Sequence, residues 1–149
     1  MSKNPRSDQK GFTLIELLVV VAVLGIVTGI AVVKYLDALD KAKQRATMAD
    51  MRSVSRALES YIVDNHIAPN DSGGVASLEA MLIPYQITVV PVRDHWGNTY
   101  EYSSNNFDDY TLQSFGKDGA DGADISFATR MDFNLDIVIA NGVFRSAPE

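Results

Sequence analysis

The sequence contains no cysteine, so no disulfide bond can hold any part of the chain together. If the chain is exported, its loops need another means of fixation. Histidine is scarce too, because the chain has only His66 and His95. Two lone histidines without a cluster of further ligands do not make a zinc site, and we expect none here.

Signatures of catalysis are also missing from the sequence. It has no glycine-rich dinucleotide motif, no P-loop and no nucleophile beside a suitable base. We therefore predict that the chain is not an enzyme. The alternative from a different class is a periplasmic hydrolase on a membrane anchor, with a catalytic pair among the acids of residues 118–136. Purified protein that turns over a substrate, rather than forming filaments, would favour that alternative.

Basic charge is sparse in the second half of the chain. Residues 65–149 carry twelve acidic and four basic side chains, which gives a net charge of −8. A nucleic-acid partner needs a basic face for its phosphates. We therefore expect no nucleic-acid partner, whereas the acidic charge suits cations.

One long apolar run, Phe12–Val33, contains Glu16 as its only charged residue. Its 22 residues would span about 33 Å as a helix, which is enough to cross a bilayer. Lys3, Arg6 and Lys10 precede the run and predict that the N-terminus stays in the cytoplasm. The run therefore predicts a single membrane-spanning helix.

Three interpretations of this run compete. The first is a cleavable secretory signal with Gly29-Ile30-Ala31 as its cleavage site, and the second is a plain membrane anchor. Both leave Glu16 unexplained, since a carboxylate at a helix centre in lipid costs roughly 2.5–3.5 kcal/mol. The third is a helix that leaves the lipid and packs into a bundle of identical helices, where the carboxylate finds a partner.

The segment Gly11-Phe12-Thr13-Leu14-Ile15-Glu16 resembles the signal of the type IV pilins and the type II secretion pseudopilins. The resemblance implies that a prepilin peptidase cuts between Gly11 and Phe12 and that Phe12 is then N-methylated. It also implies that Glu16 meets the new N-terminal amine of an adjacent subunit. Because neither buried charge is tolerable alone, such a pair favours one register between neighbouring subunits.

Glycines and one missing proline bear on the shape of the run. Relatives often have glycine at the position of Gly25, where the helix can unwind in a filament. Alternatively, Gly25 and Gly29 simply let membrane helices approach closely. Many relatives have a proline where this chain has Val33, so we expect a straighter helix here.

Residues 34–64 contain neither glycine nor proline and predict a continuing amphipathic helix. Small apolar residues form one line along it, from Leu39 to Ala49. A heavier line further on is predicted to face the core of a globular domain: Met51, Val54, Leu58, Tyr61 and Ile62.

The rest of the chain predicts a short helix, capped by Ser77, and a small antiparallel sheet. Alternating residues predict strands at 99–102 and 110–114, and a final hairpin at 135–144 turns at Ala140-Asn141-Gly142. We predict an α+β fold, with a long N-terminal helix packed on a small antiparallel sheet, as in pilins. The predicted parts are a cleaved leader at 1–11, the long helix at 12–64 and a globular domain at 65–149.

Three further segments resemble the major pseudopilin of type II secretion systems. They are Tyr61-x-x-Asp64-Asn65-x-x-x-Pro69, Asp94-His95-Trp96-Gly97-Asn98-Thr99-Tyr100-Glu101-Tyr102 and Ser114-Phe115-Gly116-Lys117-Asp118-Gly119. One departure is His95, where relatives have proline. From the residues alone, Trp96 is a large packing residue beside a turn.

The resemblance implies a structural subunit of a pseudopilus, a helical filament that drives protein export. Implied partners are copies of the chain, the prepilin peptidase, an inner-membrane assembly platform, minor pseudopilins, and membrane lipid before assembly. The subunit would be a single-pass inner-membrane protein that moves into a periplasmic filament. The alternative is a subunit of a true type IV pilus, which would be extracellular and serve adhesion, motility or DNA uptake.

The segment GKDGADGADIS places Asp118, Asp121 and Asp124 at every third position. Three carboxylates on a glycine-rich loop repel each other, and calcium takes about six to eight oxygen ligands. The resemblance implies a calcium ion in this loop. Asp118 and Asp124 stand at the matching positions, and backbone carbonyls such as that of Phe115 would complete the shell. Asp121 is an additional candidate ligand.

Two acids beyond the loop are candidate ligands of lower rank. Asp132 and Asp136 would contribute from the strand side. The alternative to a calcium site is a solvated acidic turn. Bound metal would take the place of the missing disulfide in fixing the C-terminal region.

Overall fold

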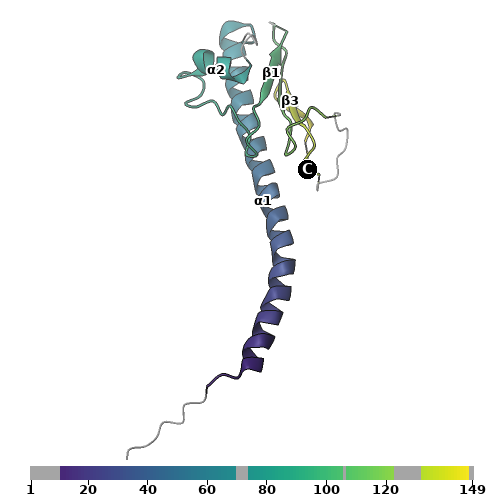
Figure 1. The fold of residues 1–149 in the computed structure, drawn as a ribbon. Helices are drawn as coiled ribbons and strands as arrows, with labels where there is room; N and C mark the ends of the chain where they lie inside the picture. Colours follow the sequence, from purple (N-terminus) through teal and green to yellow (C-terminus); the bar gives the residue numbers. More distant parts are fainter. Residues whose placement is uncertain (1–10, 70–73, 106, 123–131, 148–149) are drawn as a thin grey trace, which may run out of the picture. The chain divides into compact units, whose positions relative to one another are not determined.

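The computed structural model describes residues 11–69, 74–105, 107–122 and 132–147 (Figure 1). The chain divides into two compact units, Met1–Ala38 and Leu39–Glu149. Helix α1, Leu14–Asn65, runs from the first unit into the second. Its first residue lies two positions after the predicted start at Phe12.

The described part of the first unit is mostly apolar helix with its side chains exposed. Leu14 is 87% exposed and Val33 is 59% exposed. The helix is long and apolar enough to cross a membrane, and none of its most apolar stretch is buried within the chain. Gly25 and Gly29 lie within α1 without interrupting it. An exposed apolar surface of this extent marks a membrane or protein interaction site.

The second unit contains a second, short helix, α2, Val75–Leu82, whose N-cap is Gly74. The prediction that Ser77 caps this helix is wrong. Its hydroxyl donates to the Gly74 carbonyl at 2.7 Å from within the first turn. The helix starts earlier than predicted because Val75 as well as Leu78 is buried in the core.

The second unit also contains an antiparallel meander with strand order β1-β2-β3-β4. The strands are β1 Glu101–Ser104, β2 Tyr110–Ser114, β3 Ile137–Ala140 and β4 Val143–Ser146. β1 begins two residues later than predicted. The reason is that Thr99 bridges back to Arg93, and Tyr100 N donates to the Val92 carbonyl.

The hairpin of β3 and β4 turns through Asn141 and Gly142, as predicted. Their φ angles are 48° and 79°, and two successive positive values are typical of the type I′ turn that suits a two-residue connection. Asn141 Oδ1 also accepts a hydrogen bond from Tyr110 N at 2.9 Å. This bond ties the turn to the start of β2.

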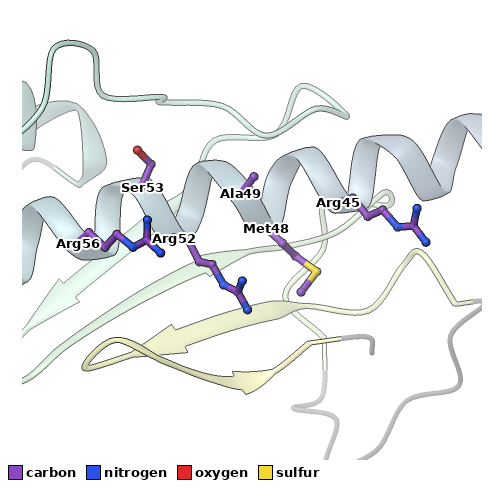
Figure 2. A pocket seen from close by; sticks show the side chains of 6 residues that line it. All are labelled: Arg45, Met48, Ala49, Arg52, Ser53 and Arg56. Atoms are coloured by element: carbon purple, nitrogen blue, oxygen red, sulfur yellow. The ribbon is translucent and has the colours of Figure 1, made fainter.

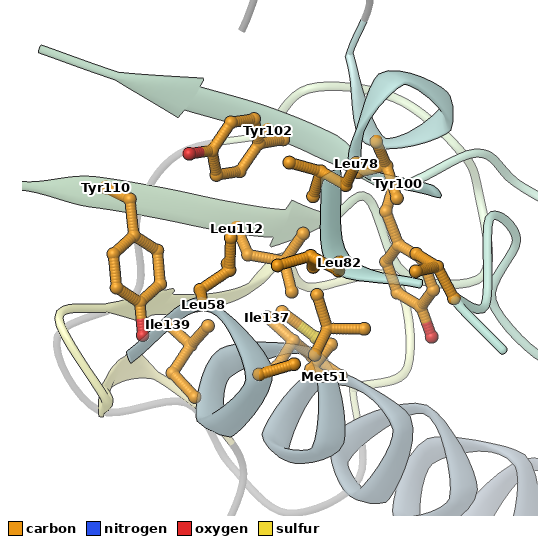
Figure 3. Close-up of a cluster of buried hydrophobic side chains, with 14 residues drawn as sticks. Met51, Leu58, Leu78, Leu82, Tyr100, Tyr102, Tyr110, Leu112, Ile137 and Ile139 are labelled. Carbon is orange, nitrogen blue, oxygen red and sulfur yellow. The ribbon is translucent and has the colours of Figure 1, made fainter. Parts of the chain in front are cut away.

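One hydrophobic core joins α1, α2 and the sheet in the second unit (Figure 3). From α1, Met51, Val54 and Leu58 are fully buried, so the prediction that this line faces the core is confirmed. Tyr61 and Ile62 are half-buried against the same cluster. Their partners from α2 and the sheet include Leu78, Leu82, Tyr102, Tyr110, Leu112, Ile137 and Ile139. The small-residue line from Leu39 to Ala49 lies outside this core.

A long N-terminal helix and a small antiparallel sheet give the α+β, pilin-like fold that the sequence predicts. In the second unit the helix places acidic and hydroxyl groups beside the turns that lead into and out of the sheet. Those turns carry the polar segments discussed below.

Candidate functional site

The start of α1 carries a reciprocal pair of side chains, Thr13 and Glu16. Thr13 N and Thr13 Oγ1 each donate to Glu16 Oε2 at 3.1 Å. Glu16 N lies 3.3 Å from Thr13 Oγ1 and donates to it. This is a capping box, in which the N-cap residue and the third helical residue satisfy each other's backbone amides.

The capping box gives Glu16 a local partner within a single chain. Sequence reasoning paired Glu16 only with an amine on another subunit. The signal for the local partner was the spacing Thr13-x-x-Glu16, which is the usual capping-box pattern. Gly11 and Phe12 precede the helix without secondary structure and are exposed. The bond between them therefore lies outside the helix.

In the second unit, Asp94 organises the turn that contains Trp96. Its Oδ1 accepts hydrogen bonds from Trp96 N at 3.0 Å and Asn98 N at 2.8 Å. Its Oδ2 accepts a hydrogen bond from the hydroxyl of Ser114 at 2.9 Å. A buried carboxylate with three donors is satisfied, so Asp94 serves this turn and joins it to β2.

This turn also docks on α1. Trp96 Nε1 donates to Asp40 Oδ1 at 3.2 Å, and His95 N donates to Thr47 Oγ1 at 3.2 Å. His95 Nε2 lies 3.1 Å from Asp50 Oδ2. His95 therefore acts as a polar contact with the helix, and Trp96 adds a hydrogen bond to its predicted packing role.

Asp40 accepts a second bond from Lys117, at the start of the acidic loop. Lys117 Nζ lies 2.7 Å from Asp40 Oδ2, and the Asp40 side chain is 14% exposed. The hydrogen bond from Lys117 lowers the pKa of Asp40, while its burial opposes that effect. Asp40 thus links α1 to both the Trp96 turn and the beginning of the acidic loop. Sequence reasoning missed this link, because an acid on a mixed-charge helix carries no distinguishing signal.

The start of the acidic loop is held against residues 133–135. Lys117 N donates to the Phe133 carbonyl at 2.7 Å. Gly116 has φ 63°, and a Cβ there would lie 2.8 Å from the carbonyl oxygens of Phe133 and Leu135. Its own carbonyl accepts a hydrogen bond from Asn98 Nδ2 at 2.7 Å. Only glycine fits this close approach with a positive φ.

Asp136 is the buried carboxylate of this region, with 1% of its surface exposed. Its Oδ2 accepts hydrogen bonds from Gly122 N at 2.9 Å and Gln113 Nε2 at 3.0 Å. Its Oδ1 is buried and has no hydrogen-bond partner among the described residues. Burial raises the pKa of Asp136, the two donors oppose that rise, and the charges of Asp121 and Asp118 add to it.

The other predicted calcium ligands are placed differently. Asp118 Oδ1 accepts a hydrogen bond from Ala120 N at 3.2 Å, and Gln113 Nε2 lies 3.4 Å from Asp121 Oδ1. Asp132 instead accepts a bond from Asn134 N at 3.1 Å in a turn of its own. Asp124 lies outside the described residues, and among those described no three His, Cys, Asp or Glu side chains form a metal cluster.

The structure thus brings Asp136, ranked lower from the sequence, into the electrostatic neighbourhood of Asp118 and Asp121. The signal that could have ranked it higher is its place immediately before the apolar strand Ile137–Ala140. An acid at the buried end of a central strand is either paired or a ligand. Phe115, whose carbonyl was a predicted ligand, is half-buried just after β2.

In a comparison with known proteins, two family models match two consecutive parts of the chain. Residues 6–32 match the family model of the prokaryotic N-terminal methylation motif. Residues 34–129 match the family model of type II secretion system (T2SS) protein G. The first match includes the predicted cleavage position and Glu16, and the second covers most of the second unit.

Curated relatives agree with the second match. Type II secretion system core protein G of Pseudomonas aeruginosa is 32% identical over 133 residues, covering 80% of this chain and 93% of the relative. That of Vibrio cholerae is 33% identical over 140 residues, with 84% and 95% covered. That of Escherichia coli is 32% identical over 127 residues, with 78% and 87% covered. The chain therefore belongs to the type II secretion system protein G family, the major pseudopilins, and carries their N-terminal methylation signal.

Proposed function

We propose that this chain is the repeating structural subunit of a pseudopilus whose assembly drives protein export. The observation that carries the proposal is the methylation motif at residues 6–32 immediately followed by the protein G region at 34–129. The exposed apolar helix of the first unit supports it, because identical helices packed side by side would bury that surface. The work of such a protein is polymerisation, and we propose no bond chemistry for it.

Processing and assembly would act on the residues at the start of α1. Cleavage after Gly11 leaves a positive amine on Phe12, next to an apolar helix. Glu16 is held by Thr13 in the single chain. We infer that assembly moves the Glu16 carboxylate to the amine of a neighbouring subunit, since two opposite charges in an apolar bundle neutralise each other.

The charges and the apolar run support an orientation in the membrane and a route into the filament. Lys3, Arg6 and Lys10 keep the leader on the cytoplasmic side of the inner membrane. The second unit then lies in the periplasm before assembly. An inner-membrane assembly platform would lift the subunit from lipid into the filament, together with minor pseudopilins.

A true type IV pilus was the alternative. The match to protein G over residues 34–129, and the curated relatives of the same name, favour the secretion system instead. A periplasmic hydrolase has no support from the geometry of the described acids of residues 118–136, which are engaged in turn and strand contacts.

We also propose that the acidic loop holds a calcium ion. What supports the fit is Asp136 Oδ1, a buried carboxylate oxygen without a partner among the described residues. Asp118 and Asp121 lie close enough to raise the pKa of Asp136, so the region holds excess negative charge. These three side chains, with Asp124 and the Phe115 carbonyl, would hold the ion. Calcium would supply neutralising charge and a cross-link between the loop and β3.

The deciding experiment for the subunit role uses a host strain that lacks its own protein G. Expression of the full chain should restore both a mature product beginning at Phe12 and a periplasmic or surface filament visible by electron microscopy. It should also restore release of the host's exported proteins. A mature chain that forms no filament and restores no export would overturn the proposal.

A further inference from the structure

The helix α1 carries a groove that the proposed function does not explain. It has a volume of about 480 Å³ and is lined by Arg45, Met48, Ala49, Arg52, Ser53 and Arg56 (Figure 2). We call it the arginine groove. Met48 and Ala49 contribute apolar lining, and Arg45, Arg52 and Arg56 contribute three guanidinium groups.

The arginines of the groove have no salt-bridge partner within the described chain. Arg45, Arg52 and Arg56 are exposed, and none of them is in a salt bridge between described residues. Arg52 lies 5.1 Å from the ring centroid of Phe144, which fixes its direction. An arginine cluster of this kind with apolar lining is suited to a partner that carries both a carboxylate and an aromatic ring.

Such a pair of residues stands at the tip of the turn between β1 and β2. Phe107 is 70% exposed, and Asp108 beside it is exposed as well. Asp108 makes no hydrogen bond or salt bridge to any described residue, whereas Asp109 next to it accepts a bond from Asn141 Nδ2 at 2.7 Å. We call Phe107 and Asp108 the acidic tip.

Hydrogen bonds between described residues hold the turn below the acidic tip. Asn105 Oδ1 accepts hydrogen bonds from Phe107 N at 2.9 Å and Asp109 N at 3.2 Å. Ala68 N donates to the Phe107 carbonyl, which fastens the turn to the chain just after α1. The tip is therefore preorganised, and docking it costs little conformational entropy.

We propose that the arginine groove of one subunit receives the acidic tip of another copy of this chain. This inference rests on the proposed filament. Groove and tip are different patches of the same chain, so their contact is heterologous and generates an open-ended helical polymer. Their charges are opposite, and both have an apolar part.

The axial geometry agrees with stacked parallel subunits. The tip is fastened just after the end of α1 at Asn65, and the groove extends from Arg45 to Arg56. At 1.5 Å per residue, these groove ends lie about 30 Å and about 14 Å below Asn65 along the helix. A neighbour displaced along the helix axis by a distance in this range brings its tip level with the groove.

Site-specific cross-linking tests this contact cleanly, because the chain contains no cysteine. Full-length Arg56→Cys and Asp108→Cys variants are co-expressed in the same host, and filaments are oxidised before electrophoresis. We expect a mixed disulfide dimer that needs both variants. Pairing Arg56→Cys with Glu101→Cys, an exposed acid on β1 outside the tip, is the matched control and should give little dimer.

Charge reversal provides the second measurement. Arg56→Glu or Asp108→Arg alone should lower filament yield, roughly five- to tenfold, because like charges facing across an interface oppose association. The double variant should restore most of the yield. Both side chains are exposed, and thermal melting of each variant checks that the second unit still folds.

The outcomes separate this inference from the proposed function. Absence of the mixed dimer in filaments of the two co-expressed cysteine variants, with wild-type filaments of normal yield, would overturn the groove contact and leave the filament proposal standing. A mature wild-type chain that forms no filament at all would instead remove the basis of both.

Discussion

Glu16 Oε2 lies 3.1 Å from both Thr13 N and Thr13 Oγ1, so the carboxylate on which assembly is proposed to depend already has a partner in the single chain. The capping box explains how the subunit tolerates Glu16 before assembly. The carboxylate compensates backbone and hydroxyl donors at the helix start, where the helix dipole also favours negative charge. Assembly then has to exchange one favourable contact for another.

The first prediction separates the cap from the charge. Glu16→Leu removes both, whereas Glu16→Gln keeps the capping geometry because glutamine serves equally in a capping box. If the charge pairs with a neighbouring amine, both variants insert and are cleaved but assemble poorly. The measurements are the processed fraction on gels and the filament yield by microscopy. Normal filament yield from Glu16→Gln would rule out the charge pairing.

The second prediction concerns processing. Gly11→Val should leave an unprocessed precursor in the membrane, because a side chain before the scissile bond hinders the peptidase. A Cβ at Gly11 meets no atom within 4 Å in the chain itself, so the substitution does not disturb the fold. Mass spectrometry of wild-type filaments should show a chain that begins at methylated Phe12. A chain beginning at Val32 would support the secretory-signal interpretation instead.

The fold could be predicted from the sequence wherever periodicity and turn chemistry act locally. The heavy apolar line at Met51, Val54 and Leu58 identified the core face of α1, and Asn141-Gly142 identified the last hairpin. The N-cap of α2 was misplaced because burial of Val75, a tertiary effect, decides where that helix starts. Local capping preference for Ser77 was the weaker influence.

The candidate site was less predictable, because its contacts join residues far apart in sequence. The bond between Trp96 Nε1 and Asp40 spans 56 positions, and the salt bridge between Lys117 and Asp40 spans 77. No local pattern marks Asp40 among the other acids of α1. Asp136 Oδ1, which has no partner among the described residues, also depends on packing, since only the folded sheet buries it.

A third prediction concerns the salt bridge between Asp40 and Lys117. Lys117 lowers the pKa of Asp40 below its ordinary value of 3.8. The folded state therefore binds fewer protons than the unfolded state, and the stabilisation is present above that value and lost as the pH falls through the lowered pKa. In a fragment of residues 36–149, Asp40→Asn should lower the melting temperature at pH 7. The difference in melting temperature should close as the pH falls below 3.8 through the lowered pKa.

The expected difference in melting temperature between wild type and Asp40→Asn is roughly 1–8 °C. A partly exposed ion pair contributes about 0.2–1 kcal/mol, and 1 kcal/mol shifts the melting temperature of a domain of ~100 residues by about 4–8 °C. In Asp40→Asn the side-chain amide oxygen would still accept the bond from Trp96 Nε1, so the variant removes only the charged contact with Lys117. Glu101→Gln, an exposed acid outside the described salt bridges, is the control and should leave the curve unchanged. A difference that stays constant with pH would contradict the mechanism.

The last prediction concerns calcium. The fragment of residues 36–149 should melt at higher temperature in millimolar calcium than in chelator. Calcium at about 100 times its Kd would add about 2.7 kcal/mol to the free energy of unfolding. Asp118→Ala and Asp124→Ala should abolish that difference and reduce filament assembly.

A matched pair of variants then tests the part played by the strand side. Asp136→Asn keeps an acceptor for Gly122 N and Gln113 Nε2 but removes the buried charge, so the response to calcium should disappear. Asp132→Asn keeps the acceptor for Asn134 N in a separate turn, so the response should persist. Identical melting curves of the wild-type fragment with and without calcium would favour the solvated acidic turn. Loss of the response in Asp132→Asn but not in Asp136→Asn would move the ion away from the buried oxygen of Asp136.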